Sequence, residues 1–252
     1  MSVYHQLNNS YTSNWSLAMT FSADGTGHCN INYNSHHVNL RAEDYDGTGD
    51  TPKQVMRFLG VMPSLDGTSE QSIKDWEKTL ENITDIFNRS PLGKKYGQLT
   101  RTVDFFAKLA GMMTDHCAKE KKDVMELEKK KIDAMYQKLG EGVVLDSSNA
   151  NLLPKFLDAH KEMIKTYGGP DKWGTLSENE QKERVARMTE TVVVELGKEA
   201  YEMLSDSEKR ALKLFIWAGC GCHKDLIKIL SRQDMLKWLH GGKKAKMSHQ
   251  CC

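Results

Sequence analysis

Short apolar or alternating stretches, separated by Gly, Asp and Ser turns, occupy the beginning of the chain. Stretches of this length and pattern are typical of β-strands. They predict one strand over Trp15–Phe21, a second over His28–Tyr33 that runs on through His37–Leu40, and a third over Val55–Val61. Because the three strands follow one another through turns alone, we expect an antiparallel meander.

The spacing of the apolar residues then changes from strand-like to helical. The turn Asp66–Ser69 can cap a helix, and the sequence Ser90–Gly93 ends one. Between these signals, apolar residues recur at the three- and four-residue spacing of one helix face. They are Ile73, Trp76, Leu80, Ile83 and Phe87.

A second apolar run, Val103–Met113, predicts a fourth strand, with Asp115 just after its end. A helix over part of Val103–Ala110 is the alternative, because periodicity alone does not separate a buried strand from a short buried helix. The predicted order is therefore strand, strand, strand, helix, strand.

The rest of the chain is charged and shows helical spacing. The pattern predicts helices over Lys119–Leu139, Leu152–Tyr167 and Glu178–Leu204, with a break at Gly140 and Gly142. The interruptions Gly168–Asp171 and Ser205–Ser207 mark further helix boundaries.

Composition indicates a soluble, intracellular protein. Charged residues make up 27% of the 252 residues, mean hydropathy is -0.58, and the apolar runs are far shorter than a membrane span. The N-terminal segment lacks the basic flank and apolar core of a secretory signal. Six scattered cysteines do not indicate a disulfide framework. The net charge of +1 gives no overall attraction to nucleic acid. The basic runs Lys119–Lys122 and Lys129–Lys131 suit a solvated helix face or, alternatively, contact with a phosphate backbone.

Asp24 and Asp115 are the candidate catalytic residues. A fourth strand that returns beside the first and parallel to it would bring the two carboxylates together at one edge of the sheet. Paired carboxylates there suit Mg²⁺, which prefers oxygen ligands and can activate an attacking oxygen on a phosphate. The alternative is that each aspartate only caps a turn.

Three motifs carry a resemblance to a known family. The segments Phe21–Leu40 and Gly111–Lys122 resemble those around the first and second catalytic acids of RNase-H-like transposases from eukaryotic cut-and-paste elements. Cys220–His223 contains the Cys-x-x-His motif found in their helical insertion. The group that the chain most resembles is the Kyakuja-Dileera-Zisupton type.

The resemblance implies an α/β fold: an RNase-H-like mixed sheet with a three-strand meander, a helix, a fourth strand parallel to the first and a large helical insertion. It divides the chain into the N-terminal part of the catalytic core over residues 1–117, the insertion over 118–228 and an atypical tail over 229–252. The fold is expected to be incomplete at its C-terminus.

By the same resemblance, Asp24 and Asp115 would bind Mg²⁺ or Mn²⁺ and act on DNA element ends in a phosphoryl-transfer reaction. The expected location is the nucleus. The expected partners are DNA and either a second copy of this chain or a full-length transposase. No association with a membrane is expected.

Cys220, Cys222 and His223 are expected to be structural residues that help to position the insertion, or to support the metal ligands from behind. We do not expect them to bind zinc, because a closed zinc site takes four ligands and no second ligand pair is evident. His116, next to Asp115, could hydrogen-bond within the site or cap the following helix.

The chain departs from the family at the third acid. The segment Leu226–Cys252 contains no glutamate, and Asp234 is a poor substitute for one. We therefore expect a truncated, transposase-derived protein with little or no strand-transfer activity alone. Whether it is an enzyme stays open. One alternative is a metal-dependent nuclease of the same fold that uses Asp24, Asp115 and a further acid such as Asp104 or Asp234. The other is a non-enzymatic helical module that binds a protein partner.

Overall fold

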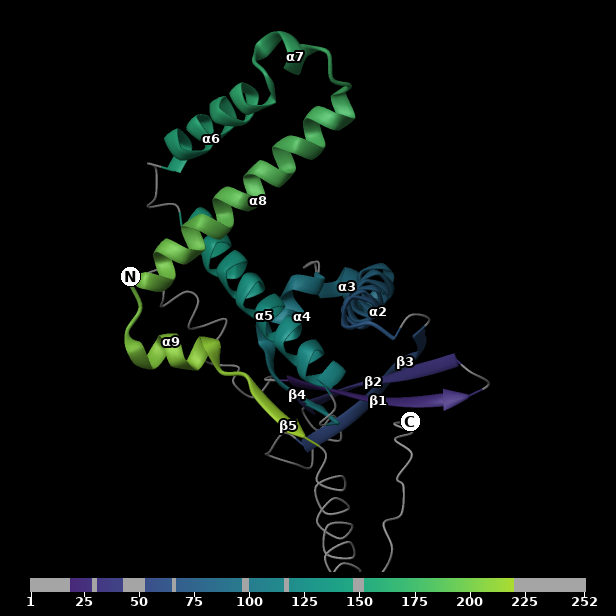
Figure 1. The fold of residues 1–252 in the computed structure, drawn as a ribbon. Helices are drawn as coiled ribbons and strands as arrows, with labels where there is room; N and C mark the ends of the chain where they lie inside the picture. Colours follow the sequence, from purple (N-terminus) through teal and green to yellow (C-terminus); the bar gives the residue numbers. More distant parts are fainter. Residues whose placement is uncertain are drawn as a thin grey trace, which may run out of the picture. The chain divides into compact units, whose positions relative to one another are not determined.

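The computed structural model is an α/β fold with a mixed β-sheet and a set of helices (Figure 1). The chain divides into two units, which are treated one at a time. The sheet unit comprises the described residues within Leu17–Thr102, Leu109–Glu128 and Phe215–Cys252, and the helical unit comprises those within Val103–Lys108 and Lys129–Leu214. The structure describes residues 19–28, 31–42, 53–64, 67–96, 100–115, 118–146 and 152–219.

The sheet has five strands in the order β3-β2-β1-β4-β5. An antiparallel meander is formed by β1 (Met19–His28), β2 (Ile31–Ala42) and β3 (Lys53–Ser64). On the other side of β1 lie β4 (Leu109–Thr114) and β5 (Ile216–Gly219), both in parallel pairings. The predicted meander and the parallel pairing of the first and fourth strands are confirmed.

The limits of β1 differ from the prediction of Trp15–Phe21, whose beginning lies outside the described residues. The strand continues to His28, so Asp24 lies within it and pairs with Ser35 of β2. The polar stretch stays extended because its backbone pairs continuously with β2 up to the hairpin turn. An apolar pattern therefore underestimates a strand whose end has a polar sequence.

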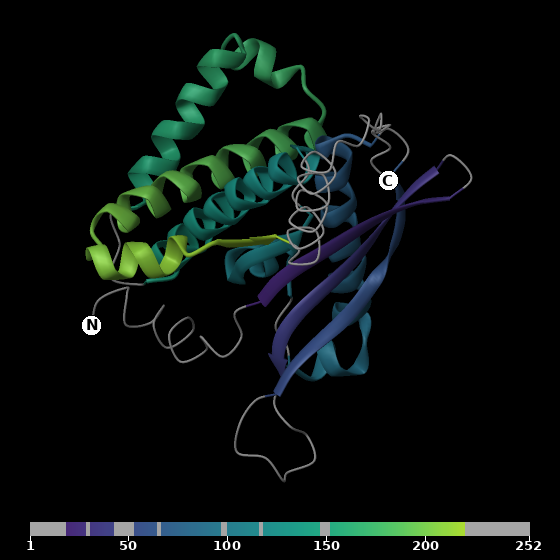
Figure 2. The ribbon, with the colours of Figure 1, turned by 60° about the horizontal axis from the view of Figure 1, so that its bottom comes forward.

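Helix α2 (Ser69–Arg89) covers one face of the meander and confirms the predicted helix (Figure 2). Its Trp76 is fully buried and stacks on Phe21 of β1, with ring centroids 4.2 Å apart, and on His36 of β2, with centroids 4.0 Å apart. The helical spacing seen in the sequence thus places the largest aromatic ring of α2 over the central strands.

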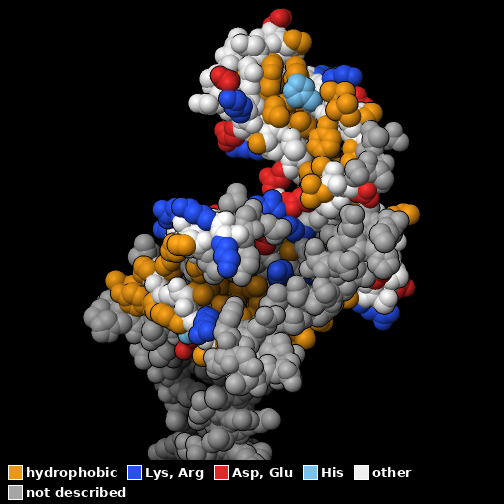
Figure 3. All heavy atoms as spheres, turned by 180° about the vertical axis from the view of Figure 1, so that it is seen from behind, with side chains coloured by type: hydrophobic (Ala, Val, Ile, Leu, Met, Phe, Trp, Pro, Cys, Tyr) orange, Lys and Arg blue, Asp and Glu red, His pale blue; other side chains and the backbone are white. Residues whose placement is uncertain are grey.

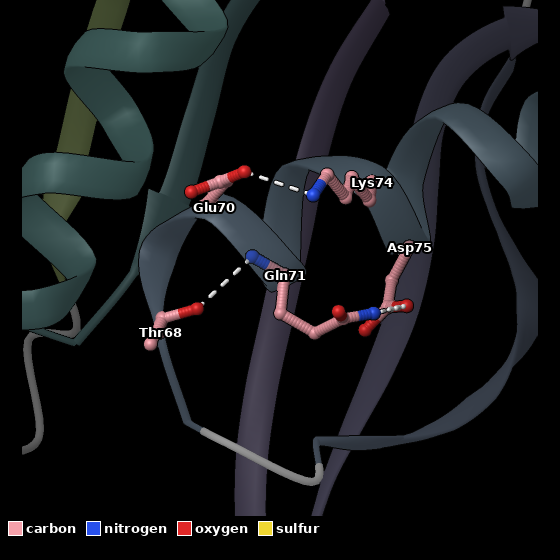
Figure 4. A network of polar contacts seen from close by, with 5 residues as sticks. All are labelled: Thr68, Glu70, Gln71, Lys74 and Asp75. Carbon is pink, nitrogen blue, oxygen red and sulfur yellow. Dashed lines mark hydrogen bonds and ion pairs between the residues drawn. The ribbon is translucent and has the colours of Figure 1, made fainter.

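The start of α2 is fixed by side chains (Figure 4). Thr68 is the N-cap, and its hydroxyl accepts a hydrogen bond of 3.2 Å from the backbone N–H of Gln71. The side-chain amide of Gln71 donates to Asp75 at 2.8 Å, and Lys74 forms an ion pair with Glu70. The predicted cap within Asp66–Ser69 is therefore correct.

The run predicted as a strand over Val103–Met113 is divided between two elements. After the short helix α3 (Pro91–Tyr96), α4 covers Thr102–Lys108 and β4 begins at Leu109. The helical alternative was thus right for the first part of the run. Phe106 of α4 is buried, as are Leu109 and Met112 of β4. Because buried apolar residues continue from the helix into the strand, the sequence pattern does not reveal where one ends and the other begins.

The helical unit contains the later part of α5 (Ala118–Leu145), then α6 (Leu152–Tyr167), α7 (Pro170–Gly174), α8 (Glu178–Glu202) and α9 (Asp206–Lys213). Helices α6 and α8 lie side by side as a hairpin joined by α7 (Figure 1). The predicted helices over Leu152–Tyr167 and Glu178–Leu204 are confirmed. None of the described helices is both long enough and apolar enough to cross a bilayer.

Helix α5 does not break at its glycines, contrary to the prediction. A Cβ atom on Gly140 would lie 1.8 Å from the carbonyl oxygen of Val193, and one on Gly197 would lie 1.8 Å from that of Tyr136. These glycines allow the backbones of α5 and α8 to touch at a crossing. Gly140 therefore serves a packing contact and not a chain reversal.

The fifth strand was not expected. Strand β5 has only four residues, of which Ile216 and Trp217 are the only large apolar ones, and so it gives a weak signal in the sequence. It lies within residues 118–228, which were assigned to the helical insertion. Its pairing with β4 aligns Gly111 with Ile216 and Thr114 with Gly219.

Alanine at the crossing glycines should destabilise the helical unit. Glycine to alanine in a helix normally stabilises by roughly 0.5–1 kcal/mol, but here the added methyl group overlaps a carbonyl oxygen. We expect G140A and G197A to lower the free energy of unfolding by about 1–3 kcal/mol, measured by thermal unfolding followed by circular dichroism. Gly174, whose Cβ would meet nothing within 4 Å, provides the control G174A. Equal melting temperatures for G140A and G174A would show that the helices do not touch there.

The buried His36 should make the sheet unit sensitive to acid. Burial, with smaller contributions from His37 and Lys119, lowers the pKa of His36 from 6.5 to about 4. Folding therefore favours the neutral ring, and this stability is full above pH 6.5 and lost as the pH falls toward 4. H36F keeps an aromatic ring on Trp76 and does not titrate.

Relative to H36F, the wild type should lose up to about 1.4 kcal/mol of unfolding free energy per pH unit in this window, measured by urea unfolding at a series of pH values. H160F, at a partly buried histidine of the helical unit, is the control. If the unfolding free energies of H36F and the wild type changed in parallel with pH, the lowered pKa of His36 would be contradicted.

Candidate functional site

The ends of β1 and β4 bring Asp24 and Asp115 into the same region of the sheet. The parallel pairing of β1 with β4 ends with Ser22 opposite Met113. Each aspartate follows that last pair by two residues: Asp24 is still within β1, and Asp115 comes directly after β4 ends at Thr114. Neighbouring strands are about 4.8 Å apart, so both acids lie near the same end of the β1–β4 pairing.

Both aspartates are held by their backbones. The hydroxyl of Ser35 donates to the carbonyl oxygen of Asp24 at 3.1 Å. The hydroxyl of Thr114 donates to the carbonyl oxygen of Asp115 at 3.2 Å, and the indole N–H of Trp217 donates to that hydroxyl at 3.1 Å. Strand β5 therefore fixes the end of β4, while the side chain of Asp24 is exposed and that of Asp115 is partly exposed.

Glu120 joins the pair from the first turn of α5. Burial, followed by the charge of Asp123, raises the pKa of Glu120 from 4.5 to about 7; Lys119 opposes the shift, and Asp115 and Asp24 add to it. Both predicted acids thus lie within electrostatic range of one carboxyl group. The sequence analysis missed Glu120 because it sits in a run of lysines typical of a solvated helix face.

Asp123 follows Glu120 by three residues on the same helix. It is only 1% exposed, and neither of its carboxylate oxygens has a hydrogen-bond partner among the described residues. The Oε2 atom of Glu120 is likewise buried and lacks a hydrogen bond. Residues three apart share a helix face, so Glu120 and Asp123 form an inner pair of acids.

The two sides of the sheet differ around this site. Phe21 faces α2, so Asp24, three residues further along β1, faces the opposite side. On that open side the register also places exposed apolar side chains. They are Met56, Phe58, Val61, Met113 and Ile216. At the other end of the site, the hydroxyl of Ser69 donates to the carbonyl oxygen of Lys119 at 3.3 Å and ties α2 to the start of α5.

The other predicted residues are not part of the described site. His116, Cys220, Cys222, His223 and Asp234 lie outside the described residues. Asp104 forms an ion pair of 2.8 Å with Lys138 in the helical unit. Within the described part of the chain, no three Asp, Glu, His or Cys side chains are close enough to form a ready-made metal site.

The donor chemistry nevertheless suits a hard divalent cation. The carboxylates of Asp24 and Asp115 come from neighbouring strands, and Mg²⁺ or Mn²⁺ commonly uses one or two carboxylates plus water and phosphate oxygens. A cation held by this pair would supply charge stabilisation for an oxygen attacking a phosphate. The carboxylates themselves would orient the ion at the edge of the sheet.

The raised pKa of Glu120 predicts a pH-dependent loss of stability. The folded state holds the proton more tightly than the unfolded chain, so stability from this group is full below pH 4.5 and is lost as the pH rises through 7. With metal removed by a chelator, E120Q should gain up to about 1.4 kcal/mol over the wild type per pH unit in that window. Urea unfolding at several pH values measures the difference, with E81Q at an exposed glutamate of the sheet unit as the control. A constant difference across the window would contradict the burial of this carboxyl.

Comparison with models of known protein families gives no match, and no curated protein is significantly similar to the chain.

Proposed function

We propose that this chain is a transposase-derived protein of the RNase-H-like type, in which Asp24 and Asp115 bind Mg²⁺ or Mn²⁺ beside a DNA phosphate. The observation that supports it is the parallel pairing of β1 with β4, because each acid follows the last aligned pair, Ser22 and Met113, by two residues. Such a position is where α/β sheets usually bind their ligands.

The strand order adds support. An antiparallel hairpin at β1 and β2, a third antiparallel strand and the parallel strand β4 agree with the arrangement that the resemblance implies, and β5 is an addition to it. The resemblance locates both acids independently of this geometry, through the motifs at Phe21–Leu40 and Gly111–Lys122. A fold alone does not define an activity, so the proposal depends on the position of the acids within it.

The start of α5 supplies cations next to the acids. Lys121 and Lys122 are exposed within a few residues of Asp115 and Glu120. Lysines beside a metal site can contact phosphate oxygens on either side of the reacting one. This arrangement favours the phosphate-contact interpretation of the basic run Lys119–Lys122, at least for its exposed members.

A specific observation favours the second candidate, a module that binds a protein partner. Helix α6 has one apolar side, yet none of its residues is buried, and Leu153 and Leu157 are 65% and 50% exposed. Hydrophobic side chains are visible along the α6–α8 hairpin (Figure 3, top). This role would make no use of Asp24 or Asp115.

Metal titration distinguishes the two. Isothermal titration of metal-free protein with Mn²⁺ should show binding that D24N and D115N each weaken at least tenfold, or about 1.4 kcal/mol, because each removes one charged ligand. D133N, at an exposed aspartate of α5, is the matched control and should bind as the wild type does.

Fluorescence anisotropy of a labelled DNA duplex completes the test. Mn²⁺ should tighten DNA binding by the wild type and not by D24N, because the ion bridges carboxylate and phosphate. Metal binding that is indifferent to both aspartates would overturn the proposal and favour the helical module. Nicking of a generic plasmid that is lost in D24N would instead favour the nuclease alternative.

A further inference from the structure

The inner acids Glu120 and Asp123 are left without hydrogen bonds. Three of their four carboxylate oxygens are buried, and none of these three receives a hydrogen bond from any described residue. Lys119, the neighbouring cation that most lowers the pKa of Glu120, does not donate to them. Buried charged groups are normally paired or bound to a metal ion, so this pair calls for a counter-charge.

The inner acids also point to a particular place. The charges of Asp123, Asp115 and Asp24 all act on Glu120, so the three carboxylates lie within electrostatic range of it. Their exposure differs: Asp24 is exposed, Asp115 and Glu120 are partly buried, and Asp123 is almost wholly inaccessible. We call these four carboxyl groups the acid series.

We propose that Glu120 and Asp123 are ligands for a divalent cation, of the Mg²⁺ or Mn²⁺ class, on the inner side of the aspartate pair. This proposal deepens the function proposed above and rests on it for the identity of the ion. Oxygen-only ligands select hard cations. Two ions roughly 3.5–4 Å apart are common in phosphoryl-transfer sites, and four carboxylates would balance the charge of two such ions.

The inner acids would thereby add two carboxylates to the strand-end pair. Glu120 follows Asp115 by five residues and lies in the first turn of α5, so the helix after β4 can present it to the same ions as the strand-end acids. No three such ligands are already grouped among the described residues, and on this proposal the bound ions draw the carboxylates together.

Titration of the full-length, metal-free chain with Mn²⁺ tests the proposal. E120Q and D123N should each weaken Mn²⁺ binding at least tenfold and lower the number of ions bound from two toward one. The controls are E81Q and D133N, which remove exposed carboxylates and should leave both quantities unchanged.

Thermal unfolding separates a metal ligand from a structural acid. Both variants replace a carboxylate by an amide of equal size, and in chelator they should melt at or above the wild-type temperature. Added Mn²⁺ should raise the melting temperature of the wild type and not that of E120Q or D123N. A full Mn²⁺-induced rise in both variants would overturn the proposal, and E120Q alone decides the question if D123N does not fold.

The outcomes distinguish this inference from the proposed function. Loss of Mn²⁺ binding in D24N and D115N, with wild-type affinity in E120Q and D123N, would overturn the inference and leave the proposed function standing. Loss only in E120Q and D123N would support the inner ligands and contradict the role of the aspartate pair. A wild-type chain that binds no Mn²⁺ would overturn both.

Discussion

The parallel pairing of β1 with β4 is the contact on which the rest of the sheet depends. It joins the N-terminal meander to strands from much later in the chain, so its formation requires the closure of a long loop. Phe21 and Met112 face each other across this pairing and are both fully buried, which supplies apolar surface to offset the entropy. Asp24 and Asp115 both follow the end of this pairing, so the proposed site depends on the same contact as the sheet.

Stacked rings form the core next to this pairing, at the expense of hydrogen bonds to some of their ring nitrogens. His36 and Trp76 are both buried, and the Nε2 atom of one and the Nε1 atom of the other lack hydrogen bonds among the described residues. Each buried polar atom without a hydrogen bond lowers the free energy of unfolding by about 1–3 kcal/mol. An aromatic side chain buries 150–250 Å², worth roughly 4–6 kcal/mol at about 25 cal/mol per Å². Burial of the stacked rings therefore outweighs the unmet polar atoms, and it keeps His36 neutral.

Sequence patterns recovered the parts of the fold that depend on local periodicity. The meander, α2, α6 and α8 follow from it. Tertiary contacts decided the rest. Gly140 signals a break when viewed alone, but it allows α8 to approach α5. Glu120 belongs to a lysine-rich run, and its burial depends on neighbours that no local pattern reveals.

The electrostatics of the acid series decide what can stabilise it. The start of α5 offers the positive end of a helix dipole to Glu120, which stabilises a carboxylate by about 0.3–1 kcal/mol. This stabilisation does not offset burial and the neighbouring acids, which still raise the pKa of Glu120 to about 7. On the proposal above, a divalent ion supplies the missing positive charge, and its binding energy is also folding energy for the sheet unit. The stability of the sheet would then depend on the same cation as the phosphate chemistry.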